Sequence, residues 1–250
     1  MALELIERPS PNWNERPHGA AIDTVVIHYT GMRSGEEALE RLCDPLAEVS
    51  AHYLVEEDGR LFKLVEEEKR AWHAGVSAWR GQENLNHTSI GIELVNPGHE
   101  FGYREFPGPQ IETLLTLLSG LKTRHTISVE GFVGHSDIAP DRKTDPGELF
   151  PWRRLAQAGF GLWSDAEAQS TEMLASIGDY GRNVAMLNKQ LGIIGYHLND
   201  AEKFDVATEC AVRAFQAHWR PETVSGCYDR GTAARLHDIV NLIRNAGENL

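Results

Sequence analysis

The feature that most constrains this 250-residue chain is a change in its hydrophobic pattern near residue 152. Before that point, short apolar runs rich in β-branched residues alternate with a stretch of helical spacing, as in α/β domains. After it, apolar residues recur at helical spacing only. The sequence therefore predicts an α/β domain with a mixed sheet flanked by helices at residues 1–160, a linker at 161–180, and a small all-α domain at 181–250.

Strand and helix signals can be placed within the first part. Asp58-Gly59 separates two strand-like runs and favours a tight hairpin with a type I′ turn. Residues 110–123 carry six apolar side chains at helical spacing and predict a helix. The predicted strands are residues 24–29, 50–56, 60–65, 88–95 and 128–134.

The last part predicts three helices, at residues 183–191, 205–219 and 229–245. Asp205 and Asp229 stand where their side chains could cap the free amides of a first helical turn. The preceding residues 162–179 show no strand signal.

Composition excludes several classes of protein. The net charge of −13 argues against a general nucleic-acid binder, because the phosphate backbone would be repelled. Three cysteines are too few for a disulfide framework or a Cys-rich metal site. No run approaches the roughly 20 apolar residues of a membrane span. The start of the chain lacks the basic and apolar segments of a secretory signal, so we expect a cytoplasmic protein, or an envelope protein if an export segment precedes this sequence.

Two histidines stand apart from the others. His28 ends an apolar strand, and His135 follows another strand and opens a charged loop that also holds Asp137, Asp141 and Asp145. Two imidazoles and one carboxylate form a common catalytic zinc site, with a fourth position for water. The spacing does not decide which aspartate would complete the set.

A hydrolytic zinc site also needs a general base and a cation for the developing oxyanion. Glu93 lies between Ile92 and Leu94 in a strand, where burial would raise its pKa toward that of a useful base. Lys143, two residues before Asp145, could supply the cation. The alternatives are a glutamate on an edge strand that faces solvent and an ordinary surface lysine.

Five sequence blocks occur in a fixed order along the chain. They are VVIHYT (25–30), SAHYLV (50–55), AWHAGVSAWRG (71–81), SIGIELVN (89–96) and GHSDIAPDRKTDPGELFPW (134–152). Together they resemble the type 2 N-acetylmuramoyl-L-alanine amidases of the AmiD/AmpD group, whose fold is related to T7 lysozyme and to animal peptidoglycan recognition proteins. The resemblance covers roughly residues 7–155.

The resemblance implies a zinc-dependent enzyme that hydrolyses the amide between N-acetylmuramic acid, or its 1,6-anhydro form, and L-alanine of peptidoglycan or muropeptides. The alternatives are a noncatalytic peptidoglycan-binding protein on the same fold and a stem-peptide zinc peptidase. The implied residues are the zinc ligands His28, His135 and Asp145, the catalytic Glu93, the oxyanion-stabilising Lys143, Trp72 and His73 near the substrate groove, and His52 in a structural role.

The resemblance is incomplete at one position and extends to the second domain. The group carries an arginine just upstream of the SIGIE block where this chain has Asn84, which leaves open the preference for the third stem residue.

Residues 211–236 resemble the three-helix peptidoglycan-binding domain of wall hydrolases through Phe215-Gln216, Gly226, Asp229 and Thr232.

Overall fold

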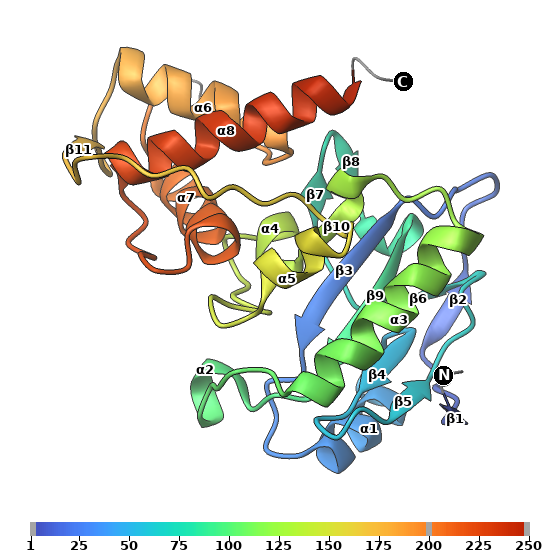
Figure 1. The fold of residues 1–250 in the computed structure, drawn as a ribbon. Coiled ribbons are helices and arrows are strands. Elements are labelled where there is room, and N and C mark those ends of the chain that lie inside the picture. The colour runs from blue at the N-terminus through green and yellow to red at the C-terminus, as the bar shows by residue number, and fades with distance from the viewer. Residues whose placement is uncertain (1–3, 199–201, 248–250) are drawn as a thin grey trace.

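A six-stranded mixed sheet forms the centre of the computed structural model, which describes residues 4–198 and 202–247 (Figure 1). The strands in sheet order are Leu5–Glu7 (β1), Leu61–Lys63 (β5), Tyr53–Val55 (β4), Ser89–Leu94 (β9), Thr24–Tyr29 (β3) and Phe132–Gly134 (β10). Strands β4, β9, β3 and β10 are parallel, and β5 is antiparallel to β4. The predicted α/β fold with a mixed sheet is confirmed.

The two faces of the sheet are covered by different elements. Helix α3 (Gly108–Arg124) packs on the face that carries Val25, Ile27, Ile90 and Ile92. Helix α1 (Gly35–Cys43) packs with the opposite face, against Leu54 and Val95. Because side chains alternate along a strand, His28 and Glu93 fall on the face turned away from α3.

Short elements complete the first part of the chain. Two small antiparallel pairs join β2 to β6 and β7 to β8. These elements are Trp13–Glu15 (β2), Lys69–Ala71 (β6), Ala78–Trp79 (β7), Gln82–Glu83 (β8), Gly98–Phe101 (α2), His135–Ile138 (α4), Trp152–Gln157 (α5), and the 3-10 helices Leu85–His87 and Val129–Gly131.

The predicted hairpin is confirmed as β4–β5, but the type I′ turn is wrong. A type I′ turn needs positive φ at both central residues, and here Gly59 has φ +93° whereas Asp58 is not in the left-handed region. The amide of Gly59 donates to Glu56 O (3.0 Å), and the Asp58 carboxylate accepts from the amide of Arg60 (3.0 Å). The Asp58 side chain thus stabilises a three-residue loop that uses only the glycine for positive φ.

A C-terminal unit, residues 173–198 and 202–247, packs against one end of the sheet (Figure 1). Its three predicted helices are confirmed as Arg182–Ile194 (α6), Val206–Trp219 (α7) and Arg230–Gly247 (α8). The caps are confirmed too, since Asp205 accepts from the amide of Thr208 and Asp229 from that of Thr232. Residues 1–3, 199–201 and 248–250, which fall within the predicted domains 1–160 and 181–250, lie outside the described residues.

The expectation of no strand in residues 162–179, and hence of an all-α second unit, is wrong. Strand β11 (Met173–Ala175) pairs antiparallel with β12 (Tyr228–Asp229). Three residues are too few to show alternation, and the partner lies far along the chain. The segment before α6 is therefore part of the C-terminal unit.

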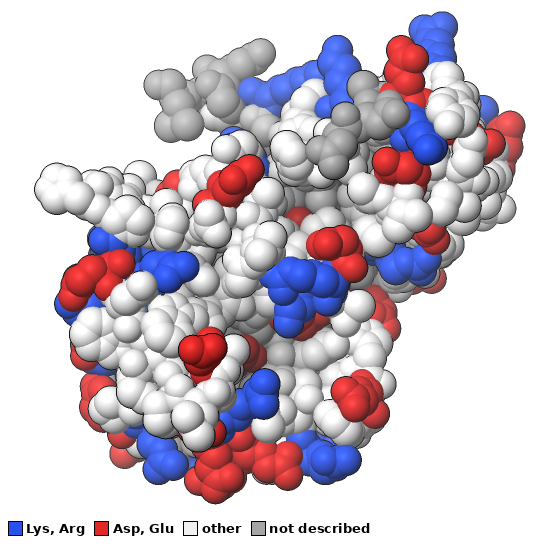
Figure 2. Space-filling model, turned by 180° about the vertical axis from the view of Figure 1, so that it is seen from behind, with Lys and Arg blue, Asp and Glu red and all other residues white. Residues whose placement is uncertain are grey.

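Apolar packing is continuous between the sheet and the C-terminal unit. One cluster of buried side chains contains Val26, Val133 and Ile138 together with Phe215 and Leu236. Charged side chains of both signs are mixed over the face seen in Figure 2. Within residues 4–198 and 202–247, no helix combines the length and apolar character that a bilayer crossing requires.

Candidate metal centre and active site

Strand register brings three chemically active residues to one edge of the sheet. His28 is the register partner of Glu93 on the neighbouring parallel strand. On the other side of β3, Gly134 pairs with Ile27, so His135 is the next residue beyond the end of β10 and lies beside His28. The carboxyl ends of parallel strands commonly form binding sites because their side chains converge at this edge.

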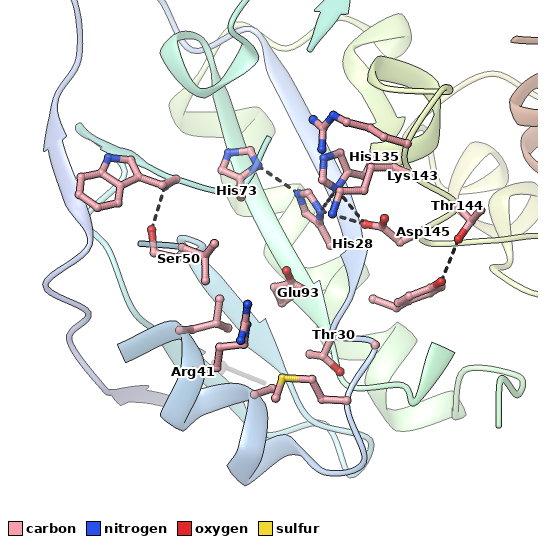
Figure 3. A pocket seen from close by; sticks show the side chains of 18 residues that line it. His28, Thr30, Arg41, Ser50, His73, Glu93, His135, Lys143, Thr144 and Asp145 are labelled. Atoms are coloured by element: carbon pink, nitrogen blue, oxygen red, sulfur yellow. Dashed lines mark hydrogen bonds and ion pairs between the residues drawn. The ribbon is translucent and has the colours of Figure 1, made fainter. Parts of the chain in front are cut away.

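His28, His135 and Asp145 converge on one point (Figure 3). The two Nδ1 atoms lie 2.9 Å apart, and Asp145 Oδ2 lies 3.0 Å from His28 Nδ1 and 3.1 Å from His135 Nδ1. All three residues are buried. The structure thus brings together the two histidines singled out in the sequence and selects Asp145 as their carboxylate neighbour.

The far nitrogen of each ring already has a partner. His135 Nε2 lies 3.1 Å from the carbonyl oxygen of Ala74, which can only accept, so Nε2 carries the proton. His28 Nε2 lies 3.1 Å from His73 Nδ1, and His73 Nε2 lies 3.2 Å from Ser89 Oγ. If His28, His73 and His135 each donate a hydrogen bond through Nε2, the Nδ1 atoms of His28 and His135 carry no proton. Their lone pairs then point at Asp145. Such an arrangement is stable when a cation lies between the three atoms.

The pKa shifts agree with this arrangement. Burial, together with the nearby His135, lowers the pKa of His28 to about 4, so its ring is neutral at pH 7. Burial alone would raise the pKa of Asp145, but charge and hydrogen bonds from His135 and His28 lower it below its ordinary value when those rings are protonated, and a cation bound between the three atoms would act in the same direction. Neutral imidazoles and an ionised carboxylate are the forms that bind metal ions.

Glu93 lies in the same cavity without a hydrogen-bond partner. Its Oε2 atom is buried and unpaired within the part of the chain that the structure describes. Burial, and then repulsion by Asp145, raises the pKa of Glu93 to about 8, although Lys143 lowers it. A carboxylate in this state accepts a proton readily near neutral pH.

The cavity has a volume of about 390 Å³, which is within the range of small-molecule sites. Lys143, Trp72 and His73 line it together with the three converging residues (Figure 3). Trp72 is half-buried, and its indole donates to Asn14 Oδ1 (3.1 Å). His52 lies outside the cavity lining, and its Nδ1 accepts from the amide of Gly91 (3.0 Å), as a structural role requires.

The other two aspartates of the loop have different positions. Asp141 is exposed. Asp137 is buried, but its carboxylate contacts Gly134, Tyr196 and His218 rather than the two histidines of the centre.

Arg41 lines the cavity from helix α1. Neither this helix nor a role for Arg41 was predicted from the sequence, although a capping motif marks the start of the helix. Ser34 is followed three residues later by Glu37, and in the structure Ser34 Oγ accepts from the amide of Glu37 (3.2 Å). Ala38, Leu39 and Leu42 then supply the buried side of the helix.

Comparisons with known proteins place this chain in a family. Residues 18–148, which include every predicted site residue, match the family described as N-acetylmuramoyl-L-alanine amidase. The N-acetylmuramoyl-L-alanine amidase AmiD of Escherichia coli K12 is 38% identical over 225 residues, covering 85% of this chain and 80% of AmiD. The 1,6-anhydro-N-acetylmuramyl-L-alanine amidase AmpD of Citrobacter freundii is 37% identical over 164 residues, covering 59% of this chain and 86% of AmpD.

The fold agrees with these sequence matches. The structure of E. coli AmiD in complex with the substrate anhydro-N-acetylmuramic acid-L-Ala-D-γ-Glu-L-Lys superposes with a TM-score of 0.75 at 35% identity, covering 91% of this chain and 92% of that one. The chain therefore belongs to the N-acetylmuramoyl-L-alanine amidase family.

Proposed function

We propose that the protein is a zinc-dependent amidase that cuts the amide between the lactyl group of N-acetylmuramic acid, or its 1,6-anhydro form, and L-alanine. The observation that carries this proposal is the convergence of His28 Nδ1, His135 Nδ1 and Asp145 Oδ2 to within 3.1 Å of one another in a buried cavity. The related AmiD was solved with a substrate that contains this amide.

The donor set fits zinc. Two imidazole nitrogens and one carboxylate oxygen are the protein ligands of many catalytic zinc sites, which keep a fourth position open. A bound zinc ion would act as a Lewis acid and lower the pKa of a coordinated water from 15.7 to about 7. The cavity that surrounds these three ligand atoms is also lined by Glu93 and Lys143.

Glu93 is proposed as the general base and then the general acid. Its unpaired oxygen can accept the proton of the attacking water and return a proton to the departing amine. Lys143 is proposed to donate a hydrogen bond to the carbonyl oxygen as negative charge develops on it. Both side chains line the same cavity, which allows both contacts with one substrate.

The cavity wall is proposed to bind the sugar and the stem peptide. Trp72 offers part of an aromatic surface, and His73 contributes one ring edge while it orients His28. Arg41 and Arg142 add positive charge. This charge would attract a substrate such as the AmiD ligand, whose γ-linked glutamate leaves an α-carboxylate free.

The C-terminal unit is proposed to bind peptidoglycan. Among its described residues, five large apolar side chains are exposed, a high share for a small unit. They are Met173, Ile177, Tyr180, Met186 and Val206. Tyr180, which is 68% exposed, could stack on a sugar ring.

Removing one ligand should remove the metal. His28→Ala and Asp145→Asn should each lower bound zinc from one ion per chain to nearly none after dialysis, as measured by elemental analysis. Asparagine has nearly the same size as aspartate, so a loss of zinc from Asp145→Asn would be due to the lost charge and not to a change in shape. His18→Ala, a change at an exposed histidine, should retain one zinc ion. A full zinc complement in Asp145→Asn would contradict the ligand assignment.

Glu93→Gln should retain zinc but lower kcat at least about 100-fold, because the proton acceptor is lost. The assay is mass spectrometry of the products released from a soluble anhydro-muropeptide, which should be the free stem peptide and the sugar. Glu100→Gln, a change at an exposed glutamate, is the matched control. Fragments cut within the stem peptide would overturn the amidase assignment, and full activity of Glu93→Gln would overturn the role of Glu93.

The raised pKa of Glu93 also predicts a pH-dependent stability in the metal-free protein. Between the unfolded value of 4.5 and the folded value of about 8, the folded state binds the extra proton, so its stability falls as pH rises. Glu93→Gln removes this effect. Its free energy of unfolding should equal that of the wild type at pH 4 and exceed it at pH 9 by on the order of 3–5 kcal/mol. Parallel stability curves from denaturant titrations would contradict the desolvation of Glu93.

Tyr180→Ala should weaken cosedimentation with insoluble peptidoglycan several-fold but leave cleavage of a soluble muropeptide unchanged. Leu46→Ala, which alters an exposed apolar residue of the first part of the chain, should change neither. Unchanged sedimentation of Tyr180→Ala would count against a binding surface at this residue.

A further inference from the structure

Asp137 connects the metal loop to the C-terminal unit. It lies two residues after His135 in helix α4 and is 1% exposed. Its Oδ2 atom accepts from the amide of Gly134 (2.7 Å) and lies 2.7 Å from His218 Nδ1, while Oδ1 accepts from the hydroxyl of Tyr196 (2.8 Å). Two of the three groups that stabilise this buried carboxylate therefore belong to the C-terminal unit.

His218 is held in a fixed orientation toward Asp137. Its ring lies between Trp152, at a centroid distance of 3.7 Å and an angle of 15°, and Trp219, at 3.6 Å and 2°. The residue is 2% exposed, so the ring cannot turn without disturbing both indoles. Tyr196 is similarly fixed, since its ring packs edge-on against Trp79 at 5.0 Å.

The same carboxylate determines the position of His135. The bond from the Gly134 amide to Asp137 closes the turn in which β10 ends and α4 begins, and His135 is the first residue of that turn. The amide of Ser136, the residue after His135, donates to the carbonyl oxygen of Asp145 (2.8 Å). A displacement of Asp137 would therefore move the backbone that carries His135 and that contacts Asp145.

We propose that His218 and Tyr196 are positioning residues of the metal centre, so that the C-terminal unit completes the site for the ion as well as contacting the substrate. This inference rests on the proposed metal site. Neither residue touches the reacting groups. They act through Asp137, because a buried carboxylate that loses its hydrogen-bond donors must find others by moving or by admitting water.

Two matched substitutions at His218 test the proposal. Asparagine can place its amide donor near the position of Nδ1, whereas leucine has a similar size and no donor. His218→Leu should weaken zinc binding about tenfold to a hundredfold in competition with a chelator, as loss of outer-shell partners of metal sites does. It should also change the visible absorption spectrum of the cobalt-substituted protein. His218→Asn should recover most of the affinity and the wild-type spectrum.

Tyr196→Phe removes only one hydroxyl group and keeps the packing of the ring. It therefore tests the proposal even if His218→Leu does not fold. Tyr196→Phe should also weaken zinc binding relative to the wild type. Arg213→Ala, at a surface ion pair with Glu209 on the same helix as His218, is the control and should bind zinc like the wild type.

The outcomes separate this inference from the proposed function. If the wild type binds no zinc or cuts no muropeptide, the proposed function fails. If the wild type does both, and folded His218→Leu and Tyr196→Phe keep the wild-type zinc affinity and cobalt spectrum, only the positioning role is overturned.

Discussion

The mutual approach of two imidazole nitrogens and one carboxylate oxygen is the constraint on which the rest of this structure depends. Three electron-rich atoms within 3.1 Å of one another repel unless a proton or a metal cation lies between them. The sheet provides the approach, because β3 and β10 are adjacent and parallel and end at the same edge. The bonds of His28 to His73 and of His135 to Ala74 then set which nitrogen of each ring faces the centre.

Catalysis and stability make opposite demands at this edge of the sheet. The proposed role of Glu93 as a base depends on its buried and unpaired Oε2 atom, and the same burial destabilises its ionised form. Asp137 differs from Glu93, since it is more deeply buried and is surrounded by three donors. Glu93 is thus left with an unpaired oxygen, whereas Asp137 accepts a hydrogen bond from the backbone beside it.

Much of this arrangement could be predicted from the sequence, and the failures have physical causes. Strand periodicity located the α/β domain, and the apolar neighbours Ile92 and Leu94 indicated that Glu93 lies in a strand where burial would raise its pKa. Spacing could not choose among Asp137, Asp141 and Asp145, because the choice depends on how one loop folds back over the end of β10. The contacts of His218 with Asp137 link residues 81 positions apart, and no local pattern reports such a pair. The type of the turn at Asp58 was predicted wrongly because a side-chain hydrogen bond stabilises a longer loop, and the short strand β11 was missed because its partner lies far along the chain.

The most direct test of the central claim is a crystal structure of the zinc-loaded protein with anomalous data collected at the zinc edge. The account predicts a single strong peak about 2.0–2.2 Å from His28 Nδ1, His135 Nδ1 and an oxygen of Asp145, with a fourth position open toward Glu93. A peak elsewhere, or coordination through the Nε2 atoms with His73 and Ala74 released, would contradict it.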